Sequence, residues 1–275
     1  MSYRVIIPTA GIGSRLGNLT KYINKSLVGI ANRPTISHII EQFPEDCEYV
    51  IALGHKGKLV RDFLELAYPD KVFYFVYVDP FEGEGSGLGR TLIACKNYLQ
   101  QPFVFISCDT LVEGKIKKPN HNWMGFTTID DVSQYRTLTI EKDKISKICE
   151  KGVLSTNNHA YIGLAGILDF EIFWEKMLDN SNNAIVQGES YGMKSLINAS
   201  NVVPYEFRWF DTGNPEELAN TRRVFEDIDA PNILEKENEA IWFVGETVIK
   251  FSDDETFISN RVKRLEELKG FVPEI

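Results

Sequence analysis

Glycines and cationic residues follow the first apolar run of the chain within one short stretch. This stretch reads IPTAGIGSRLGNLTKYINKSL and contains Gly11, Gly13, Arg15 and Lys25 in that order. Glycines permit close approach of the backbone to phosphate oxygens, and an arginine supplies a planar fork of donors. The stretch therefore predicts a phosphate-binding loop, with a plain turn that carries a surface arginine as the alternative.

The familiar nucleotide-binding motifs fit this loop poorly. A dinucleotide-binding fingerprint requires G-x-G-x-x-G, because its third glycine lets the helix pack closely against the strand. Leu16 stands where that glycine should be, and the turn lacks the lysine followed by Ser or Thr of a P-loop. Both readings are therefore disfavoured, and a G-x-G-S-R loop remains.

The first half of the chain indicates which elements would position this loop. Short runs rich in β-branched and aromatic residues alternate with segments whose apolar residues recur at helical spacing. Strands are predicted at 3–9, 49–54, 71–79 and 102–109, and helices at 34–43, 56–68 and 87–99. The alternation predicts an α/β fold with a Rossmann-like, mostly parallel sheet flanked by helices, whose ligands bind at the carboxyl ends of the strands.

The second half of the chain has a different character. Strands or hairpins are predicted at 122–130, 137–151, 159–170 and 201–207, and helices at about 170–179, 189–199 and 214–225. Antiparallel additions to a parallel sheet commonly form the acceptor half of a site. The pattern changes again after 227–232, so we expect a domain over 1–230 and a small appendage over 231–275.

Composition limits the class of partner. The 275 residues carry a formal net charge of −9, which argues against nucleic-acid and anionic-membrane partners because both require a basic face. No apolar run approaches the roughly 20 residues of a membrane span, and the opening MSYR is no signal peptide, so we expect a cytoplasmic protein. The four cysteines lack the spacing of a zinc site. A homo-oligomer remains open.

Residues 7–40 resemble the signature of the sugar-1-phosphate nucleotidyltransferases, a family that includes phosphocholine-type cytidylyltransferases. The shared pattern is a strand, then G-x-G-[ST]-R-L, then L-T, then a lysine ten residues beyond the arginine. The match departs at Asn24 and Ser26, where the family usually has prolines. The resemblance, over about 3–225, implies a GT-A-like nucleotidyltransferase fold and transfer of a nucleotidyl group from an NTP to a phosphorylated small molecule, with release of pyrophosphate.

The resemblance also implies roles for individual residues. Arg15 would hold the leaving pyrophosphate, and Lys25 would bridge the α-phosphate and the acceptor, which makes them the catalytic candidates. Asp109, at the end of FISCD, and Asp211, in WFDTGNPEEL, match the aspartates that bind magnesium in the family. The remaining candidates are Ala10, Gly11, Gly13, Ser14, Gly87 and Leu88, which with Arg15 would bind the nucleotide, and Glu150, Lys151 and Gly163 for the acceptor.

Structural alternatives stay open at several of these positions. A lone aspartate at a strand end usually forms a turn or caps a helix. The second motif also fits an N-capping turn, with Asn214 as the cap and Pro215 at the first helical position, although this leaves Asp211 unexplained. The glycines of EGEGSGLGRTL could form a flexible loop, and Glu150 and Lys151 could be a charge pair at a hairpin end.

The substrates are left open by the sequence. The NTP could be CTP, UTP or dTTP, and the acceptor a sugar 1-phosphate for surface polysaccharide or lipopolysaccharide precursors, or a phosphorylated amino alcohol such as phosphocholine. An aromatic cage formed by Tyr161, Trp123 and Trp209 would favour a quaternary ammonium. Outside enzymes, the alternative is a non-catalytic regulator that binds a nucleotide sugar, and the retention of both cations and both carboxylates speaks against it.

The tail at 238–268 predicts two short strands across a Gly-Glu turn, followed by a charged helix. It resembles the opening of the small lobe in kinases of the aminoglycoside and choline phosphotransferase type. A lysine in V-I-K, here Lys250, contacts ATP phosphates in those kinases. This resemblance implies that the chain is the front part of a longer bifunctional protein, with a packing or dimerisation appendage as the alternative.

Overall fold

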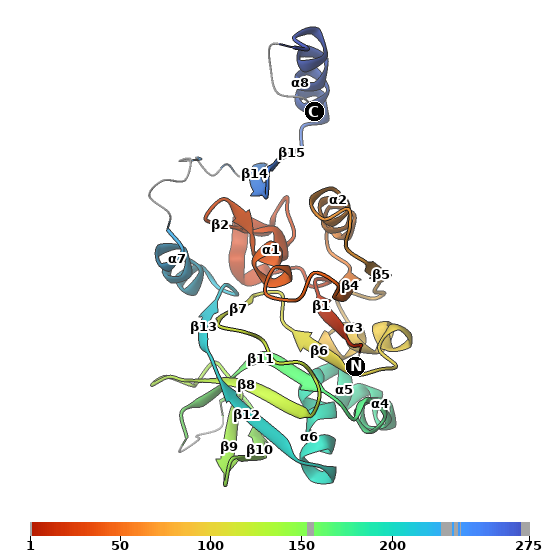
Figure 1. The fold of residues 1–275 in the computed structure, drawn as a ribbon, viewed down its shortest axis with the longest axis vertical. Helices are drawn as coiled ribbons and strands as arrows, with labels where there is room; N and C mark the ends of the chain where they lie inside the picture. The colour runs from red at the N-terminus through yellow and green to blue at the C-terminus, as the bar shows by residue number, and fades with distance from the viewer. Residues whose placement is uncertain (1, 153–156, 227–232, 234–235, 237, 271–275) are drawn as a thin grey trace.

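A twisted nine-stranded sheet forms the centre of the molecule in the computed structural model, which describes residues 2–152, 157–226, 233, 236 and 238–270 (Figure 1). Its parallel half contains β6 (Phe103–Ile106), β1 (Arg4–Pro8), β4 (Glu48–Leu53) and β5 (Phe73–Tyr77), side by side in that order. The parallel strands predicted from the sequence are therefore confirmed, and their carboxyl ends meet at one edge of the sheet.

Antiparallel strands extend the other half of the sheet. They are β8 (Asn122–Thr128), β9 (Thr137–Glu141), β10 (Lys144–Cys149) and β11 (His159–Ile167), while β12 (Val202–Glu206) runs parallel to β8. Here β11 pairs antiparallel with β6, β8 and β9, so it joins the two halves. The predicted α/β class with antiparallel additions is confirmed.

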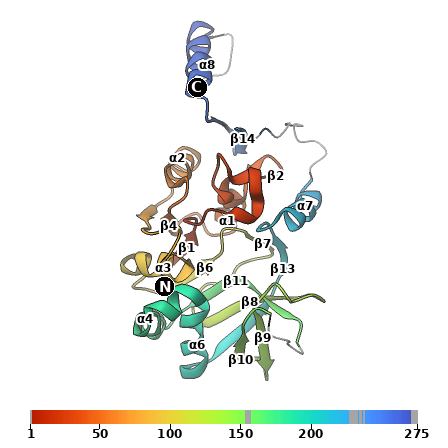
Figure 2. The same ribbon diagram turned by 180° about the vertical axis from the view of Figure 1, so that it is seen from behind.

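Helices cover both faces of the sheet (Figures 1 and 2). Val5 and Ile7 of β1 pack in one apolar cluster with α1 (Thr35–Ile40) and α2 (Gly57–Ala67). Ile6 points the opposite way, into a cluster with α3 (Leu88–Cys95), α4 (Phe170–Asp179) and α6 (Glu189–Ala199). Successive residues of a strand face opposite sides of the sheet, so the continuous apolar run in β1 reflects burial on both faces.

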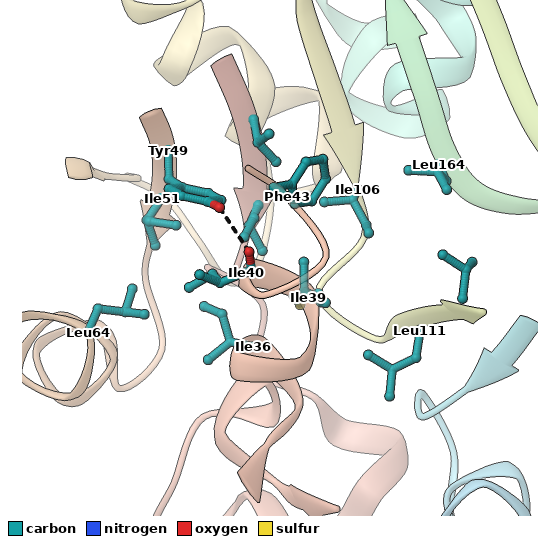
Figure 3. Packing of buried hydrophobic residues seen from close by; sticks show 14 of the residues in the cluster. Ile36, Ile39, Ile40, Phe43, Tyr49, Ile51, Leu64, Ile106, Leu111 and Leu164 are labelled. Atoms are coloured by element: carbon teal, nitrogen blue, oxygen red, sulfur yellow. Dashed lines mark hydrogen bonds between the residues drawn. The ribbon is translucent and has the colours of Figure 1, made fainter. Parts of the chain in front are cut away.

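Helix α1 seals one of these clusters over the centre of the sheet. Ile36, Ile39 and Ile40 point from the helix toward the strands, and the hydroxyl of Tyr49 in β4 donates a hydrogen bond to the carbonyl of Ile40 at 3.0 Å (Figure 3). A buried phenol needs such a partner, because an unpaired hydroxyl in an apolar core destabilises the fold. The contact fixes the C-terminal end of α1 beside β4.

Several short elements were not predicted. They are α5 (Ser181–Gln187) and an antiparallel pair of β7 (Thr110–Glu113) and β13 (Arg208–Asp211), while the predicted helix at 87–99 ends at Cys95 and continues as a 3₁₀ turn over Lys96–Tyr98. The pairing of β7 with β13 places Asp211 opposite Thr110, directly beside Asp109. Each strand of this pair has four residues, too few to give a clear alternating pattern.

The C-terminal elements match the predicted hairpin and helix. They are β14 (Glu239–Val244), β15 (Thr247–Ser252) and α8 (Glu255–Glu267), and they follow α7 (Pro215–Val224). The hairpin packs beside a smaller hairpin of β2 (Gly29–Ile30) and β3 (Arg33–Pro34), whereas α8 projects away from the body (Figure 1). The predicted boundary near residue 230 lies outside the described residues. Among the described helices, none is long and apolar enough to cross a membrane.

Gly89 allows α5 to pack against the start of α3, next to Gly87 and Leu88. A Cβ atom on Gly89 would lie 1.8 Å from the carbonyl oxygen of Ala184, so Gly89→Ala must push the two helices apart. We expect a loss of about 1–3 kcal/mol, seen as a thermal unfolding midpoint lowered by several degrees. Gly29→Ala is the control, since nothing lies within 4 Å of that position. Equal midpoints for the two variants would contradict this packing.

Candidate active site

The glycine-rich loop turns directly after β1 and leads into a 3₁₀ helix over Ser14–Thr20. Gly13 has a φ of +68°, and a Cβ atom there would lie 3.0 Å from the Cβ of Lys25 and the Cγ2 of Thr20. Glycine is therefore required by both its backbone conformation and its close neighbours. Leu16, in the place of the third glycine of a dinucleotide motif, is buried in the core and anchors the loop.

Asn24 fixes the segment that carries Lys25. Its amide nitrogen donates to the carbonyls of Thr9 at 2.8 Å and His55 at 2.6 Å. Its side-chain oxygen accepts from the backbone N–H of Ser26 at 2.9 Å and caps the 3₁₀ turn over Lys25–Leu27. Buried hydrogen bonds thus hold the loop at the two positions where the resembling family usually has prolines.

Lys25 and Asp109 form an ion pair at the end of β6. The Nζ of Lys25 lies 3.0 Å from the Oδ2 of Asp109, and both side chains are largely buried. Burial alone would raise the pKa of Asp109, but the charge of Lys25 and hydrogen bonds from Ser107 and Lys25 hold the pKa at about 2. Burial opposes the charged form of Lys25, and the charge of Asp109 outweighs it and keeps the pKa of the lysine above its usual range.

Asp211 faces the same point from the other side. The N–H of Gly213 donates to Asp211 Oδ1 at 2.8 Å, and the hydroxyl of Tyr135 donates to Oδ2 at 3.2 Å. A Cβ atom on Gly213 would lie 3.0 Å from both Asp109 Oδ2 and Asp211 Oδ1, so the two carboxylates converge on the space beside this glycine. Burial first, and then the charge of Asp109, raises the pKa of Asp211.

These two carboxylates fit a magnesium ion. Magnesium is usually bound by one or two carboxylates together with substrate phosphates and water. No group of three or more His, Cys, Asp or Glu that could hold a metal occurs in the described part of the chain. The donor set of Asp109 and Asp211 is thus typical of a metal that arrives with a phosphate ligand rather than of a closed structural site.

One cavity of about 480 Å³ brings most of the candidate residues together. Its lining includes Ala10, Gly11, Arg15, Lys25, Gly87, Leu88, Asp109, Lys151, Gly163 and Asp211. Three other candidates, Gly13, Ser14 and Glu150, are not part of the lining. Gly13 contributes through the backbone turn, while Ser14 is exposed on the loop.

Glu150 lies behind the cavity and holds a cation that does line it. Its carboxylate accepts from Arg136 Nε at 2.9 Å and from Lys194 Nζ at 2.6 Å. Burial alone would raise the pKa of Glu150, whereas these two cations lower it below its usual range. Arg136 lines the cavity and Glu150 does not, so Glu150 orients a cation at the cavity, and its contact with an acceptor stays a prediction.

Gly163 and Lys151, which the sequence predicts to contact the acceptor, both line the cavity. Gly163 has a φ of +70°, and a Cβ atom there would lie 3.0 Å from the Cβ of Ser107, so glycine lets β11 pass this neighbour. The pKa of Lys151 is lowered by burial and by the charges of Arg136 and Arg15, which makes this region ready to bind an anion.

Three lining residues carry buried polar atoms that have no hydrogen-bond partner in the described part of the chain. The atoms are Glu189 Oε2, Tyr161 Oη and Trp209 Nε1. Glu189 is only 3% exposed and Tyr161 6%. Buried polar atoms are almost always paired, so Trp209 Nε1 indicates a place for a polar ligand, whereas the side chains of Glu189 and Tyr161 lie close enough to pair with each other. Trp123 is fully buried elsewhere in the core and contributes nothing to an aromatic cage.

Sequence reasoning missed Arg136, Glu189 and Tyr135. Glu189 opens α6 and reads as an ordinary acidic residue in a first helical turn. Arg136 and Tyr135 lie in a polar stretch that precedes β9. No local spacing marks these residues, because the long-range pairing of β9 with β11 brings them to the cavity.

Comparison with known proteins agrees with this architecture, although no model of a known protein family matches the sequence. The chain is similar to the bifunctional protein GlmU of Methanococcus vannielii, with 23% identity over 257 residues, which are 89% of this chain and 60% of that protein. The chain thus spans about 60% of the length of this relative.

Solved structures show the same fold. A UDP-glucose pyrophosphorylase in complex with UDP-glucose matches with a TM-score of 0.69 and 19% identity, over 82% of this chain and 98% of that one. A CTP:phosphocholine cytidylyltransferase from Streptococcus pneumoniae matches with a TM-score of 0.65 and 16% identity, over 82% and 100%. The fold is therefore that of the nucleotidyltransferases. The resemblance to sugar-phosphate nucleotidyltransferases that residues 7–40 predict is confirmed.

Glu189 gives the site a pH signature that does not depend on any ligand. Burial raises its pKa above the usual 4.5, so the folded state binds the proton more tightly than the unfolded chain does. The wild-type protein should lose stability as the pH rises through 4.5 toward the raised pKa, whereas Glu189→Gln cannot ionise. We expect the free energy of unfolding of the variant, relative to wild type, to increase over this range in urea titrations. A difference that stays constant with pH would contradict it.

Proposed function

We propose that the chain transfers a nucleotidyl group from an NTP to a phosphorylated sugar and releases pyrophosphate. The observation that supports this most strongly is the convergence of Arg15, Lys25, Asp109 and Asp211 in one cavity. Two cations and a two-carboxylate metal site match what in-line transfer at an α-phosphorus requires, because charge must be neutralised on both reacting phosphates.

The residues of the chain suffice for a mechanism without a general base. A phosphate monoester near neutral pH is already an anion, so the acceptor can attack the α-phosphorus directly. Lys25 would bridge the α-phosphate and the acceptor phosphate, and Arg15 would hold the leaving pyrophosphate. Asp109 and Asp211 would hold Mg²⁺, which when bound neutralises charge on the phosphates. Lys151 and Arg136 would attract the acceptor phosphate to the cavity.

The unpaired polar atoms favour a sugar phosphate over an amino-alcohol phosphate. A sugar hydroxyl can donate to Glu189 Oε2 and accept from Tyr161 Oη or Trp209 Nε1. A trimethylammonium group has neither donors nor acceptors and would leave Trp209 Nε1 unpaired, at a cost of about 1–3 kcal/mol. Arg136 and Lys151 already place positive charge near Glu189, which further disfavours a cationic acceptor.

A cytidylyltransferase for a phosphorylated amino alcohol is the second candidate. Tyr161 and Trp209 line the cavity beside the carboxylate of Glu189, and aromatic faces with a nearby carboxylate can bind a quaternary ammonium. The likeness to the phosphocholine cytidylyltransferase fold agrees with this reading. The first candidate, a nucleotidyltransferase for a sugar phosphate, would fit the supply of precursors for a surface polysaccharide.

The tail remains a separate prediction. Lys250, the lysine of the kinase-like V-I-K segment, is paired with Glu239 at 2.9 Å and lies over the ring of Phe257. We propose a nucleotidyltransferase domain over 1–230 and a fusion of its C-terminal side to a kinase-like domain. A small-molecule kinase would produce the phosphorylated acceptor that the first domain consumes. A homo-oligomer is equally a prediction.

Pyrophosphate release tests the proposal and separates its alternatives. CTP, UTP, dTTP and GTP are each combined with sugar 1-phosphates and with amino-alcohol phosphates, in magnesium and in chelator. Magnesium-dependent release with a sugar 1-phosphate is the expected result, whereas release only with an amino-alcohol phosphate supports the second candidate. If no pair releases pyrophosphate, both enzyme candidates are contradicted, and a regulator that binds a nucleotide sugar is the remaining alternative.

Lys25→Ala should lower kcat/KM by at least about 100-fold, because the lysine supplies charge to the reacting phosphates. Circular dichroism should still report the wild-type fold. Lys58→Ala is the matched control, since Lys58 is exposed on α2 and paired with Asp62 outside the cavity. A Lys25→Ala enzyme as active as this control would remove the proposed role of the lysine.

Tyr161→Phe should raise KM for the sugar phosphate by about three- to tenfold, because the acceptor loses its proposed hydrogen bond to the tyrosine hydroxyl. KM for the NTP should stay at the wild-type value. Tyr205→Phe serves as the control, since that hydroxyl contacts the ring of His121 at 2.9 Å and is not part of the cavity lining. An equal rise in KM for both substrates would argue against an acceptor contact.

A further inference from the structure

We propose that the C-terminal hairpin of β14 and β15 positions Lys25, and that Trp242 is the residue through which it acts. The indole of Trp242 is 2% exposed, and its Nε1–H donates to the carbonyl oxygen of Leu27 at 3.0 Å. Leu27 belongs to the same 3₁₀ turn as Lys25. A segment that follows the predicted domain boundary therefore contacts the backbone of the proposed catalytic lysine's own turn.

A second hydrogen bond from the hairpin holds the chain a few residues further on. The backbone N–H of Phe243 donates to the carbonyl of Asn32 at 2.8 Å, at the turn between β2 and β3. Trp242 and Phe243 thus hold the segment 25–34 at two points. The contacts come from adjacent residues of one strand, so the hairpin and this segment must move together.

The indole of Trp242 is itself fixed by aromatic neighbours. The ring of Phe63 in α2 meets it edge-on with centroids 5.2 Å apart, and the ring of Phe251 in β15 stacks on it at 6.4 Å. Val244 lies two residues further along β14, on the same face of the strand, and is also buried in this cluster. A shift of the indole would disturb both α2 and the hairpin, so the donor to Leu27 has a defined position.

Lys25 therefore lies between two anchors. Asn24 holds the turn on one side through the carbonyls of Thr9 and His55, and Trp242 holds it on the other through Leu27. The Lys25 side chain then reaches Asp109 across the cavity. Misplacement of a reacting or bridging group by about 1 Å can lower the rate 100-fold, so this second anchor bears directly on turnover. Trp242 is not part of the cavity lining and is a positioning residue; this role rests on the proposed function of Lys25.

Trp242→Phe tests the inference, because it keeps an aromatic ring and removes the donor to Leu27. We expect kcat to fall about tenfold, with little change in KM for the NTP. Trp174→Phe is the matched control: Trp174 is also 2% exposed and donates its Nε1–H to a buried carbonyl, that of Leu99 at 2.9 Å, in the cluster on the opposite face of the sheet. The control should lose similar stability and keep the wild-type kcat.

Hydrogen exchange separates this inference from the proposed function. The amides of Leu27 and Val28 donate within the Lys25 turn, and they should exchange faster in Trp242→Phe than in Trp174→Phe or wild type. Hydrogen exchange can be measured even if no NTP and acceptor pair reacts. In that case the proposed function fails, but the exchange rates still show whether Trp242 holds the Lys25 turn. If Trp242→Phe does not fold, replacement by 3-benzothienylalanine removes the donor at constant shape. Unchanged exchange at both amides, or an equal fall in kcat in both variants, overturns the proposal.

Discussion

The arrangement of the site depends on the ion pair between Lys25 and Asp109. Two opposite charges are held 3.0 Å apart with side-chain exposures of 19% and 15%, so neither is well solvated and each stabilises the other. Removal of one partner would leave an uncompensated buried charge, which typically costs several kcal/mol. The loop after β1, the turn capped by Asn24 and the end of β6 must all meet at this pair, and the fold around them is built to bring them there.

The charges around this pair are unbalanced in two places, with an excess of carboxylates at one and an excess of cations at the other. Asp211 adds a second carboxylate, and its raised pKa reflects burial and the charge of Asp109. Lys151 and Arg136 add cations to the cavity lining, and the pKa of Lys151 is lowered by burial and by its positive neighbours. A cation beside the carboxylates and phosphate groups beside the lysine would relieve both conflicts. This charge distribution is the one that the proposed transfer between a metal-bound nucleotide and an anionic acceptor requires.

The fold could be predicted from the sequence where the spacing of apolar residues is regular. The site could be predicted where it lies at the carboxyl ends of the parallel strands. Arg15, Lys25, Asp109 and Asp211 could be grouped because their segments share a resemblance and because the carboxyl ends of parallel strands lie at one edge. The pairing of β7 with β13, which sets Asp211 beside Asp109, could not be seen in four-residue strands. Glu189, Arg136 and Trp242 reach their places through long-range packing, and such contacts leave no local pattern around the residues that make them.

The fate of the α-phosphorus tests the central claim most directly. The enzyme would be incubated with magnesium, a sugar 1-phosphate and an NTP labelled at the α-phosphorus, and the products separated by ion-exchange chromatography. The account predicts that the label moves into a nucleoside diphosphate sugar, with one unlabelled pyrophosphate released for each transfer. Label that stays in the NTP, or that appears only as free NMP by hydrolysis, for every NTP and acceptor pair would contradict it.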